Sequence, residues 1–125
     1  MSTKPRPKNL DLTKIRLPLP GFISILHRIS GFGMFLMIGV MLGMLSLSLD
    51  SPQGYERVAE ILTSWLGKLV VLGLIWAFSH HFIAGIRFLL LDLHIGAELT
   101  AARKSSALVL ILSLALTVVM GVFIW

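Results

Sequence analysis

Three long stretches of the sequence contain almost no charged side chains. Residues 29–49 and residues 105–125 are each 21 residues long and contain no ionisable side chain. Between them, residues 69–86 contain only two titratable groups, His80 and His81. Because a helix needs about 20 consecutive apolar residues to span the hydrocarbon core of a bilayer, each stretch predicts a transmembrane helix. We therefore expect an all-α membrane protein with three transmembrane helices.

Composition supports this fold class and excludes several kinds of site. Of the 125 residues, 56% are hydrophobic and only 14% are charged, whereas about a quarter of the residues of a typical soluble domain are charged. The chain has no cysteine, which excludes disulfides, iron–sulfur ligation and thiolate ligation of haem by its own residues. The first apolar stretch starts too far along the chain, and is too long, to be the apolar region of a cleaved signal peptide.

The apolar stretches divide the chain into two parts. Residues 1–20 are polar and contain four prolines, so we interpret them as an N-terminal arm. Residues 21–125 form the predicted transmembrane domain, with helices at about 21–49, 64–93 and 102–125. In the first connection, Ser51 and Pro52 have the residue types that cap and begin a helix, and they predict a short interfacial helix.

Small residues at four-residue spacing predict places where the helices pack closely. They lie on the first and third predicted helices, as Gly39 and Gly43 and as Ser113, Thr117 and Gly121.

The distribution of Lys and Arg predicts the orientation. Seven of these residues precede the first span or lie between the second and third, and two lie between the first and second. The seven are Lys4, Arg6, Lys8, Lys14, Arg16, Arg103 and Lys104, and the two are Arg57 and Lys68. By the positive-inside rule the N-terminus is cytoplasmic and Trp125 lies on the far side. The net charge of +5 is thus a topology signal, and we expect a lipid bilayer rather than nucleic acid as the partner.

The first cluster of candidate functional residues begins the first predicted helix. Ser24, His27 and Arg28 are spaced so that all three project from one helix face. A hydroxyl, an imidazole and a fixed cation together can bond a carbonyl or pair with a carboxylate. The alternative is that Arg28 extends to the lipid headgroups while Ser24 satisfies a helix-terminal amide.

The second cluster is the pair His80 and His81 in the middle of the second predicted helix. Neutral imidazole is a common ligand of haem iron. Small residues share a row with His81, namely Gly73, Ala77 and Gly85, whereas His80 shares a row with the bulky Trp76. A flat macrocycle or another helix could approach the first row, which favours His81 as a ligand. The alternative is a histidine bonded to a backbone carbonyl of a neighbouring helix. A six-coordinate haem would need its second ligand from another subunit.

These residues resemble two motifs of the cytochrome b membrane-anchor subunits of succinate dehydrogenase, in their bacterial form. The first motif is Arg6-Pro7 followed by Ser24-Ile25-Leu26-His27-Arg28-Ile29-Ser30. The second is His81-Phe82-Ile83-Ala84-Gly85-Ile86-Arg87 followed by Asp92. Both occur in order on the first and second predicted helices, and the resemblance covers essentially the whole chain.

The resemblance implies roles for the matching positions. His81 corresponds to the axial ligand of haem b, whose iron takes its other ligand from a second small membrane-anchor subunit. Ser24 and Arg28 correspond to residues at the ubiquinone site, and His27 and Arg28 to residues near the haem propionates. No residue of this chain is expected to be catalytic. The other implied partners are the iron–sulfur subunit and the flavoprotein subunit, and the implied location is the bacterial inner (cytoplasmic) membrane.

Some positions carry no assignment. Phe88 stands where the family often has histidine, and His94 stands where a small residue is usual; no role is assigned to these residues, to His80 or to Asp92. Two alternative functions stay open, namely the anchor of a fumarate reductase working in the opposite direction, and a structural anchor without haem. A small transporter subunit is disfavoured because residues 105–125 offer no ionisable group.

Overall fold

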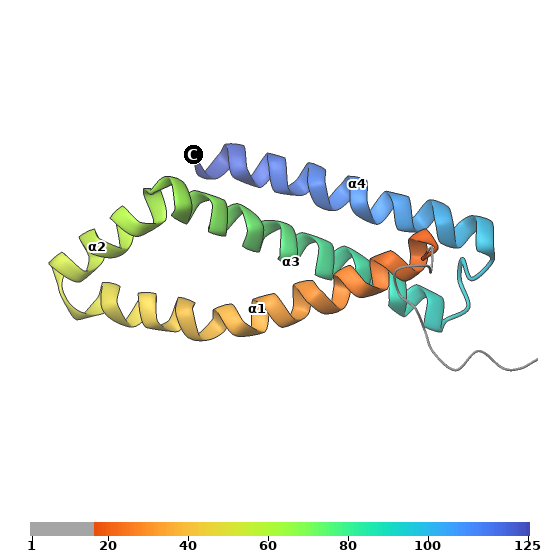
Figure 1. Ribbon diagram of the computed structural model, residues 1–125, viewed down its shortest axis with the longest axis horizontal. Helices are drawn as coiled ribbons and strands as arrows, with labels where there is room; N and C mark the ends of the chain where they lie inside the picture. The colour runs from red at the N-terminus through yellow and green to blue at the C-terminus, as the bar shows by residue number, and fades with distance from the viewer. Residues whose placement is uncertain (1–16) are drawn as a thin grey trace, which may run out of the picture.

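The computed structural model describes residues 17–125, which form four α-helices (Figure 1). They are α1 (Leu19–Asp50), α2 (Pro52–Thr63), α3 (Trp65–Asp92) and α4 (Leu99–Ile124). Three of them, α1, α3 and α4, are long and apolar enough to cross a membrane, so the expected class of three-span, all-α membrane protein is confirmed. Most of the expected N-terminal arm, including Arg6 and Pro7, lies outside the described residues.

The three long helices run along one another, with α3 between α1 and α4 in the view of Figure 1. The start of α1, the end of α3 and the start of α4 lie at one end of the molecule, which we call the histidine end because it lies nearest His27 and His81. At the other end are α2 and the C-terminus (Figure 1). The helices α1 and α3 lie close together near the histidine end and separate toward α2, which joins them.

Proline and serine set the boundaries of the first three helices. Pro20 lies in the first turn of α1, where its missing N–H is not needed. The extended backbone of Ser51 separates α1 from α2, and its hydroxyl accepts a hydrogen bond from the Gly54 N–H at 3.0 Å. Ser64 caps α3 in the same way, accepting from the Gly67 N–H at 3.1 Å. The short helix that Ser51 and Pro52 predict is therefore α2.

A left-handed residue closes α3. His94 has a φ of 60°, and its N–H donates to the Leu91 carbonyl at 2.9 Å while the N–H of Ile95 donates to the Leu90 carbonyl at 2.9 Å. Glycine or asparagine usually occupies this position of a helix terminus. His94 therefore helps to reverse the chain, together with Gly96 at a φ of 73°. The following helix, α4, begins at Leu99, three residues before the predicted start at about residue 102.

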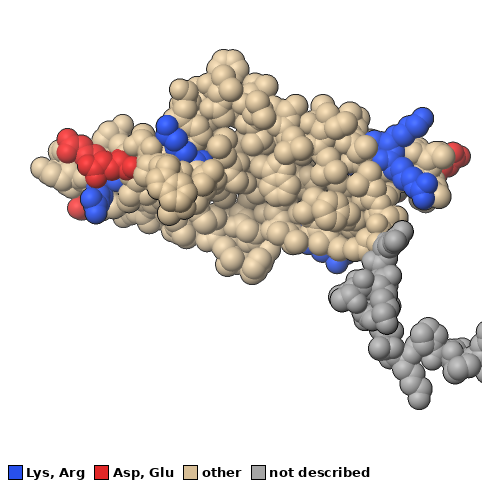
Figure 2. All heavy atoms as spheres, turned by 45° about the horizontal axis from the view of Figure 1, so that its top comes forward, with Lys and Arg blue, Asp and Glu red and all other residues tan. Residues whose placement is uncertain are grey.

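The interior is small and largely polar, whereas the outside is apolar. The buried apolar residues where α1, α3 and α4 meet are Ile23, Ala84 and Val109. The buried polar residues are Ser30, Ser79, His80, Arg87, Ser106 and Ser113. Figure 2 shows Lys, Arg, Asp and Glu gathered mainly toward the two ends, with a broad uncharged surface between them. This distribution is typical of a protein whose flanks contact lipid or other membrane helices.

The two predicted rows of small residues differ in what they contact. A Cβ built on Gly121 of α4 would lie 2.8 Å from Leu72 Cδ2, so α4 approaches α3 closely there. In the part of the chain that the structure describes, nothing lies within 4 Å of a Cβ on Gly39 or Gly43. The row on α4 therefore packs inside this chain, and the pair on α1 leaves an open surface.

The contact of the His81 ring of α3 with α1 depends on Gly31. A Cβ at this position would lie 2.7 Å from Cε1 and 3.1 Å from Nδ1 of His81. Real Cβ atoms are not found at 2.7 Å from another carbon, so only glycine allows the His81 ring to lie against the backbone of α1. The position has no special φ, and what requires glycine is space.

We expect Gly31→Ala to lower the stability of the protein by about 1–3 kcal/mol, the usual effect of overpacking a close contact. The matched control is Gly33→Ala, because no described atom lies within 4 Å of a Cβ there and alanine is favoured over glycine within a helix by about 0.5–1 kcal/mol. The measurement is the thermal unfolding midpoint of the assembled protein in detergent. Equal midpoints for the two variants would contradict the contact.

Candidate functional site

The two clusters that the sequence singled out meet between α1 and α3. The rings of His27 and His81 are stacked, with their centroids 4.0 Å apart and their planes 9° from parallel. Phe88 meets His27 edge-on, at 5.1 Å between centroids. One histidine from each motif therefore forms a contact pair near the histidine end of the bundle. His27 and His81 are both half-buried.

A hydrogen bond fixes the protonation of the His81 ring. Its Nδ1 lies 2.9 Å from the backbone carbonyl oxygen of His27. A carbonyl oxygen can only accept, so Nδ1 carries the hydrogen and donates it. In a neutral imidazole the other nitrogen, Nε2, then holds the lone pair. The bond to a carbonyl of a neighbouring helix, which the sequence raised as an alternative to ligation, is thus present, and it leaves the coordinating nitrogen unused.

The donor set fits one axial position of a haem. Histidines that bind metals commonly donate their second ring N–H to a carbonyl or carboxylate, which orients the ring and makes the ligating nitrogen more basic. A metal held by His81 would bind at Nε2, the ring nitrogen that the hydrogen bond to the His27 carbonyl does not use. Within residues 17–125 no group of three or more His, Cys, Asp or Glu could hold a metal ion, so the described chain offers a single ligand rather than a complete metal site.

His80 has a different environment although it is the next residue. Its side chain is fully buried, and its ring stacks on Trp76 at 5.3 Å. Neither ring nitrogen has a hydrogen-bond partner among the described residues. The structure thus gives the two histidines different surroundings, since the His81 ring lies against Gly31 and His27 of α1 and the His80 ring lies beside Trp76.

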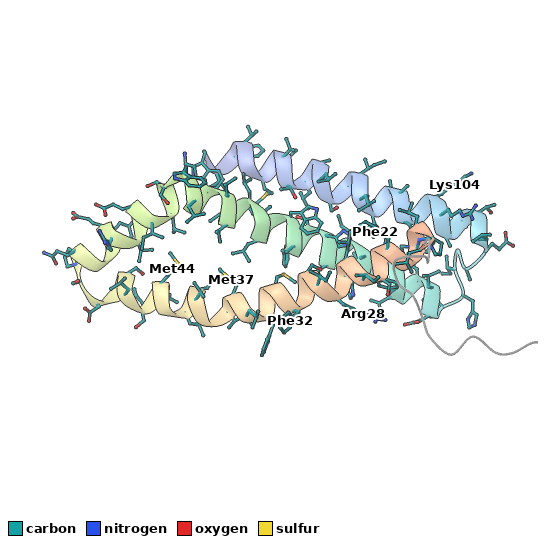
Figure 3. All side chains as sticks on the ribbon, in the orientation of Figure 1. Phe22, Arg28, Phe32, Met37, Met44 and Lys104 are labelled. Atoms are coloured by element: carbon teal, nitrogen blue, oxygen red, sulfur yellow. The ribbon has the colours of Figure 1, made fainter. Side chains whose placement is uncertain are left out.

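Ser24 and Arg28 lie at the same end of α1 as His27. Ser24 is half-buried and Arg28 is exposed. Figure 3 shows Arg28 beside the N-terminal part of α1, near the end of α3. Neither side chain forms a hydrogen bond with another residue in the range 17–125. Of the three residues in this cluster, His27 makes the ring contact with His81, and Ser24 and Arg28 leave polar groups open to a ligand or partner.

Arg87 connects α3 to α4 through hydrogen bonds. Its Nε donates to the Ser105 hydroxyl at 2.9 Å and its Nη2 donates to the Ala102 carbonyl at 3.3 Å. The guanidinium also lies 5.4 Å from the centre of the Phe88 ring. Arg87 is only 6% exposed, and its Nη1 has no partner among the described residues. The sequence placed Arg87 in a motif without giving it a role, and its position inside a predicted span was the available signal.

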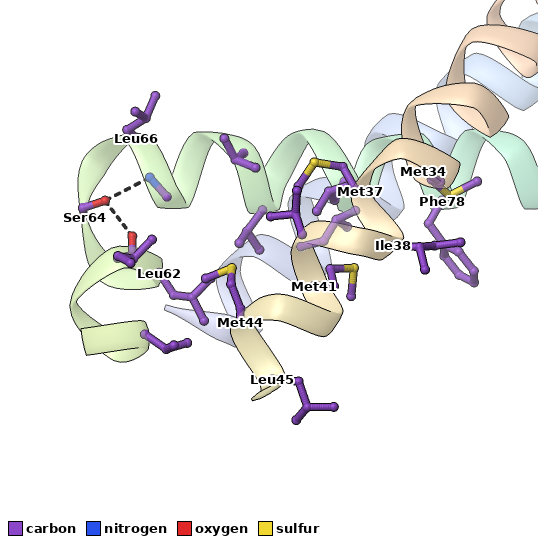
Figure 4. Close-up of a pocket in the computed structure, with 18 of the residues that line it drawn as sticks. Met34, Met37, Ile38, Met41, Met44, Leu45, Leu62, Ser64, Leu66 and Phe78 are labelled. Carbon is purple, nitrogen blue, oxygen red and sulfur yellow. Dashed lines mark hydrogen bonds between the residues drawn. The ribbon is translucent and has the colours of Figure 1, made fainter. Parts of the chain in front are cut away.

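A large apolar cavity lies between α1, α2 and α3, and neither His27 nor His81 lines it. It has a volume of about 940 Å³ and lies where α1 and α3 separate. Methionines of α1 line it at helical spacing, and Figure 4 labels Met34, Met37, Met41 and Met44. Met34 is one turn beyond Ser30, and Phe78 of α3, three residues before His81, also lines it. Flexible methionine side chains adapt to the shape of a neighbouring group.

Comparisons with known proteins agree over nearly the whole chain. The family model described as succinate dehydrogenase/fumarate reductase transmembrane subunit matches residues 2–120. A succinate dehydrogenase cytochrome b556 subunit of Coxiella burnetii (strain RSA 493 / Nine Mile phase I) is 37% identical over 122 residues, which cover 96% of this chain and 97% of the relative.

Two further relatives carry the same description. The cytochrome b556 subunit of Paracoccus denitrificans is 35% identical over 101 residues, covering 81% of this chain and 78% of the relative. That of Rickettsia typhi (strain ATCC VR-144 / Wilmington) is 26% identical over 117 residues, covering 94% and 91%. The family match, the three apolar spans and the paired histidines agree, and the chain belongs to the family of succinate dehydrogenase/fumarate reductase transmembrane subunits.

Proposed function

We propose that this chain is the membrane-anchor cytochrome b subunit of a succinate:quinone oxidoreductase. In this proposal His81 provides one axial ligand of haem b. Ser24 and Arg28 form part of the ubiquinone-reduction site. The observation that carries the proposal is the hydrogen bond from His81 Nδ1 to the His27 carbonyl. It gives this histidine, and not His80, the tautomer and orientation of a metal ligand.

Haem b would supply a one-electron carrier within the membrane. His81 would hold it through Nε2. Gly31 leaves room for the imidazole of His81, and His27 covers one face of that imidazole, so both would help to orient the ligand. No group of three or more His, Cys, Asp or Glu among residues 17–125 could hold a metal ion. We therefore expect the second axial ligand to come from another chain, the second small membrane-anchor subunit that the family resemblance implies.

The surface of α1 supports such a partner. Gly39 and Gly43 have open space beside them, and the cavity lined by Met37 and Met41 opens between α1 and α3. Apolar flanks of this kind, with small residues on them, are where membrane helices pack. The helices of the second anchor subunit would cover this surface, completing a larger bundle that encloses the haem.

The quinone site is assigned to the cytoplasmic end of α1. This chain has no cysteine and so cannot carry iron–sulfur clusters. Electrons from succinate must reach the quinone through the flavoprotein and iron–sulfur subunits, which dock on this end together with the N-terminal arm. Ser24 can donate a hydrogen bond to a quinone carbonyl, and the cationic Arg28 favours the negative charge that develops during reduction. Protons reach an interfacial site directly from the cytoplasm.

The orientation follows from the positive-inside rule. The two exposed cations Arg103 and Lys104 lie at the start of α4, at the end of the molecule where α1 begins (Figure 1). Arg57 and Lys68 lie near the opposite end. Together with the five cations of residues 1–16, this distribution supports the proposed orientation, in which the N-terminus and the histidine end face the cytoplasm across the bacterial inner membrane and the C-terminus faces the periplasm.

His81→Ala is expected to abolish the b-type absorption spectrum of the assembled complex, because it removes the ligating nitrogen. His80→Ala is the matched control, since it removes the same side chain from the adjacent position, and it should keep the haem. The measurement is the reduced-minus-oxidised spectrum per assembled complex. Haem retained in the His81 variant and lost in the His80 variant would reverse the assignment. A wild-type complex without haem would indicate a purely structural anchor.

Ser24→Ala should weaken quinone binding about two- to tenfold, the loss of a neutral hydrogen bond worth about 0.5–1.5 kcal/mol. Arg28→Leu should weaken it more, because hydrogen bonds to charged groups contribute about 1.5–3 kcal/mol. Neither change should alter succinate oxidation by a soluble dye that accepts electrons before the quinone. The measurement is the ratio of quinone reductase to dye reductase activity. An assembled Arg28→Leu complex with an unchanged ratio would show that Arg28 is only an interfacial anchor.

A further inference from the structure

Ser30 lies beside the hydrogen bond that orients His81 and has no assigned role. Its side chain is 3% exposed, and its hydroxyl donates to the same His27 carbonyl oxygen at 2.9 Å. The Ser30 oxygen is also 3.3 Å from His81 Nδ1. Three polar groups therefore meet at one point between α1 and α3: a hydroxyl, a carbonyl and a ring N–H.

The donors and acceptors at this point can be assigned from chemistry alone. The carbonyl oxygen of His27 only accepts, and it receives hydrogens from both Ser30 and His81. Because the Ser30 hydrogen is directed to that carbonyl, the lone pairs of its oxygen are left for the Nδ1–H of His81. The imidazole N–H thus faces two oxygen acceptors, one strong at 2.9 Å and one weaker at 3.3 Å.

We propose that Ser30 is a positioning residue for His81, holding the imidazole in one orientation and raising the basicity of Nε2 through its contact with Nδ1. This inference rests on the proposed role of His81 as a haem ligand. An acceptor on the distal N–H increases electron donation from the ligating nitrogen. Stronger donation favours the ferric over the ferrous haem, so Ser30 lowers the midpoint potential of the haem.

Another serine of the same chain serves as a control. It separates an effect of Ser30 on the haem potential from an effect of losing any buried serine on helix packing. Ser113 of α4 is fully buried, and its hydroxyl donates to the carbonyl three residues earlier, that of Leu110, at 3.0 Å. Ser30 makes the same local bond within α1. The two serines thus share burial and helix geometry, and of the two only Ser30 contacts His81.

The experiment is a redox titration of the haem in the assembled complex, followed by its spectrum and by the low-spin electron paramagnetic resonance signal of the ferric form. Ser30→Ala should keep the haem and shift the midpoint potential upward. Ser30→Thr keeps a hydroxyl that can bond the same carbonyl and should restore the wild-type potential. Ser113→Ala should leave both the potential and the resonance signal unchanged.

The outcomes distinguish this inference from the function on which it rests. If His81→Ala loses the haem but Ser30→Ala has the wild-type potential and signal, the role of Ser30 is wrong and that of His81 stands. If Ser113→Ala shifts the potential as much as Ser30→Ala, the effect is one of packing and the inference also fails. If His81→Ala keeps the haem, both assignments fail. Should Ser30→Ala not assemble, Ser30→Cys replaces it, because a thiol is only a weak acceptor and should shift the potential in the same direction.

Discussion

The hydrogen bond between His81 Nδ1 and the His27 carbonyl joins the two halves of the site. It connects α3 to α1 at 2.9 Å, at a point where Gly31 lets the helices approach. Since the bond uses Nδ1, it assigns the lone pair to Nε2. A contact that holds the helices together therefore also sets the tautomer of His81, and the stack of His27 on His81 accompanies the same close approach. Without this bond, nothing in the described structure would distinguish His81 from the other polar side chains inside the bundle.

The membrane explains why so much of the interior is polar. Six of the buried residues are serines, a histidine or an arginine, and most of them bond backbone carbonyls or one another. Lipid offers no partner for such groups, so they face the other helices. Arg87 illustrates the constraint, because its guanidinium is turned to Ser105 and Ala102 of α4. The polar side chains thereby fix how α3 sits between its neighbours, while the apolar flanks contact lipid or partner helices.

Much of the fold could be predicted from the sequence because the bilayer imposes a simple rule on length and polarity. The three uncharged stretches correspond to α1, α3 and α4, and the Ser51–Pro52 pair begins α2. The rows of neighbours favour His81 over His80 as a ligand, and this stays a prediction. Periodicity could not reveal the contact of His81 with a carbonyl on another helix, since that depends on the relative placement of α1 and α3. For the same reason the roles of Gly31, Ser30 and Arg87 were missed, although all three lie within or beside the recognised motifs.

The central claim is that this chain is a haem-binding anchor that completes its site with another membrane subunit. The most direct measurement is purification of the complex in mild detergent through a tag on this chain, with the haem content determined and the co-purifying chains identified. The account predicts a b-type haem that loses its spectrum when His81 is replaced, together with a flavoprotein, an iron–sulfur protein and a second small membrane subunit. An intact complex that contains these chains and no haem would contradict it.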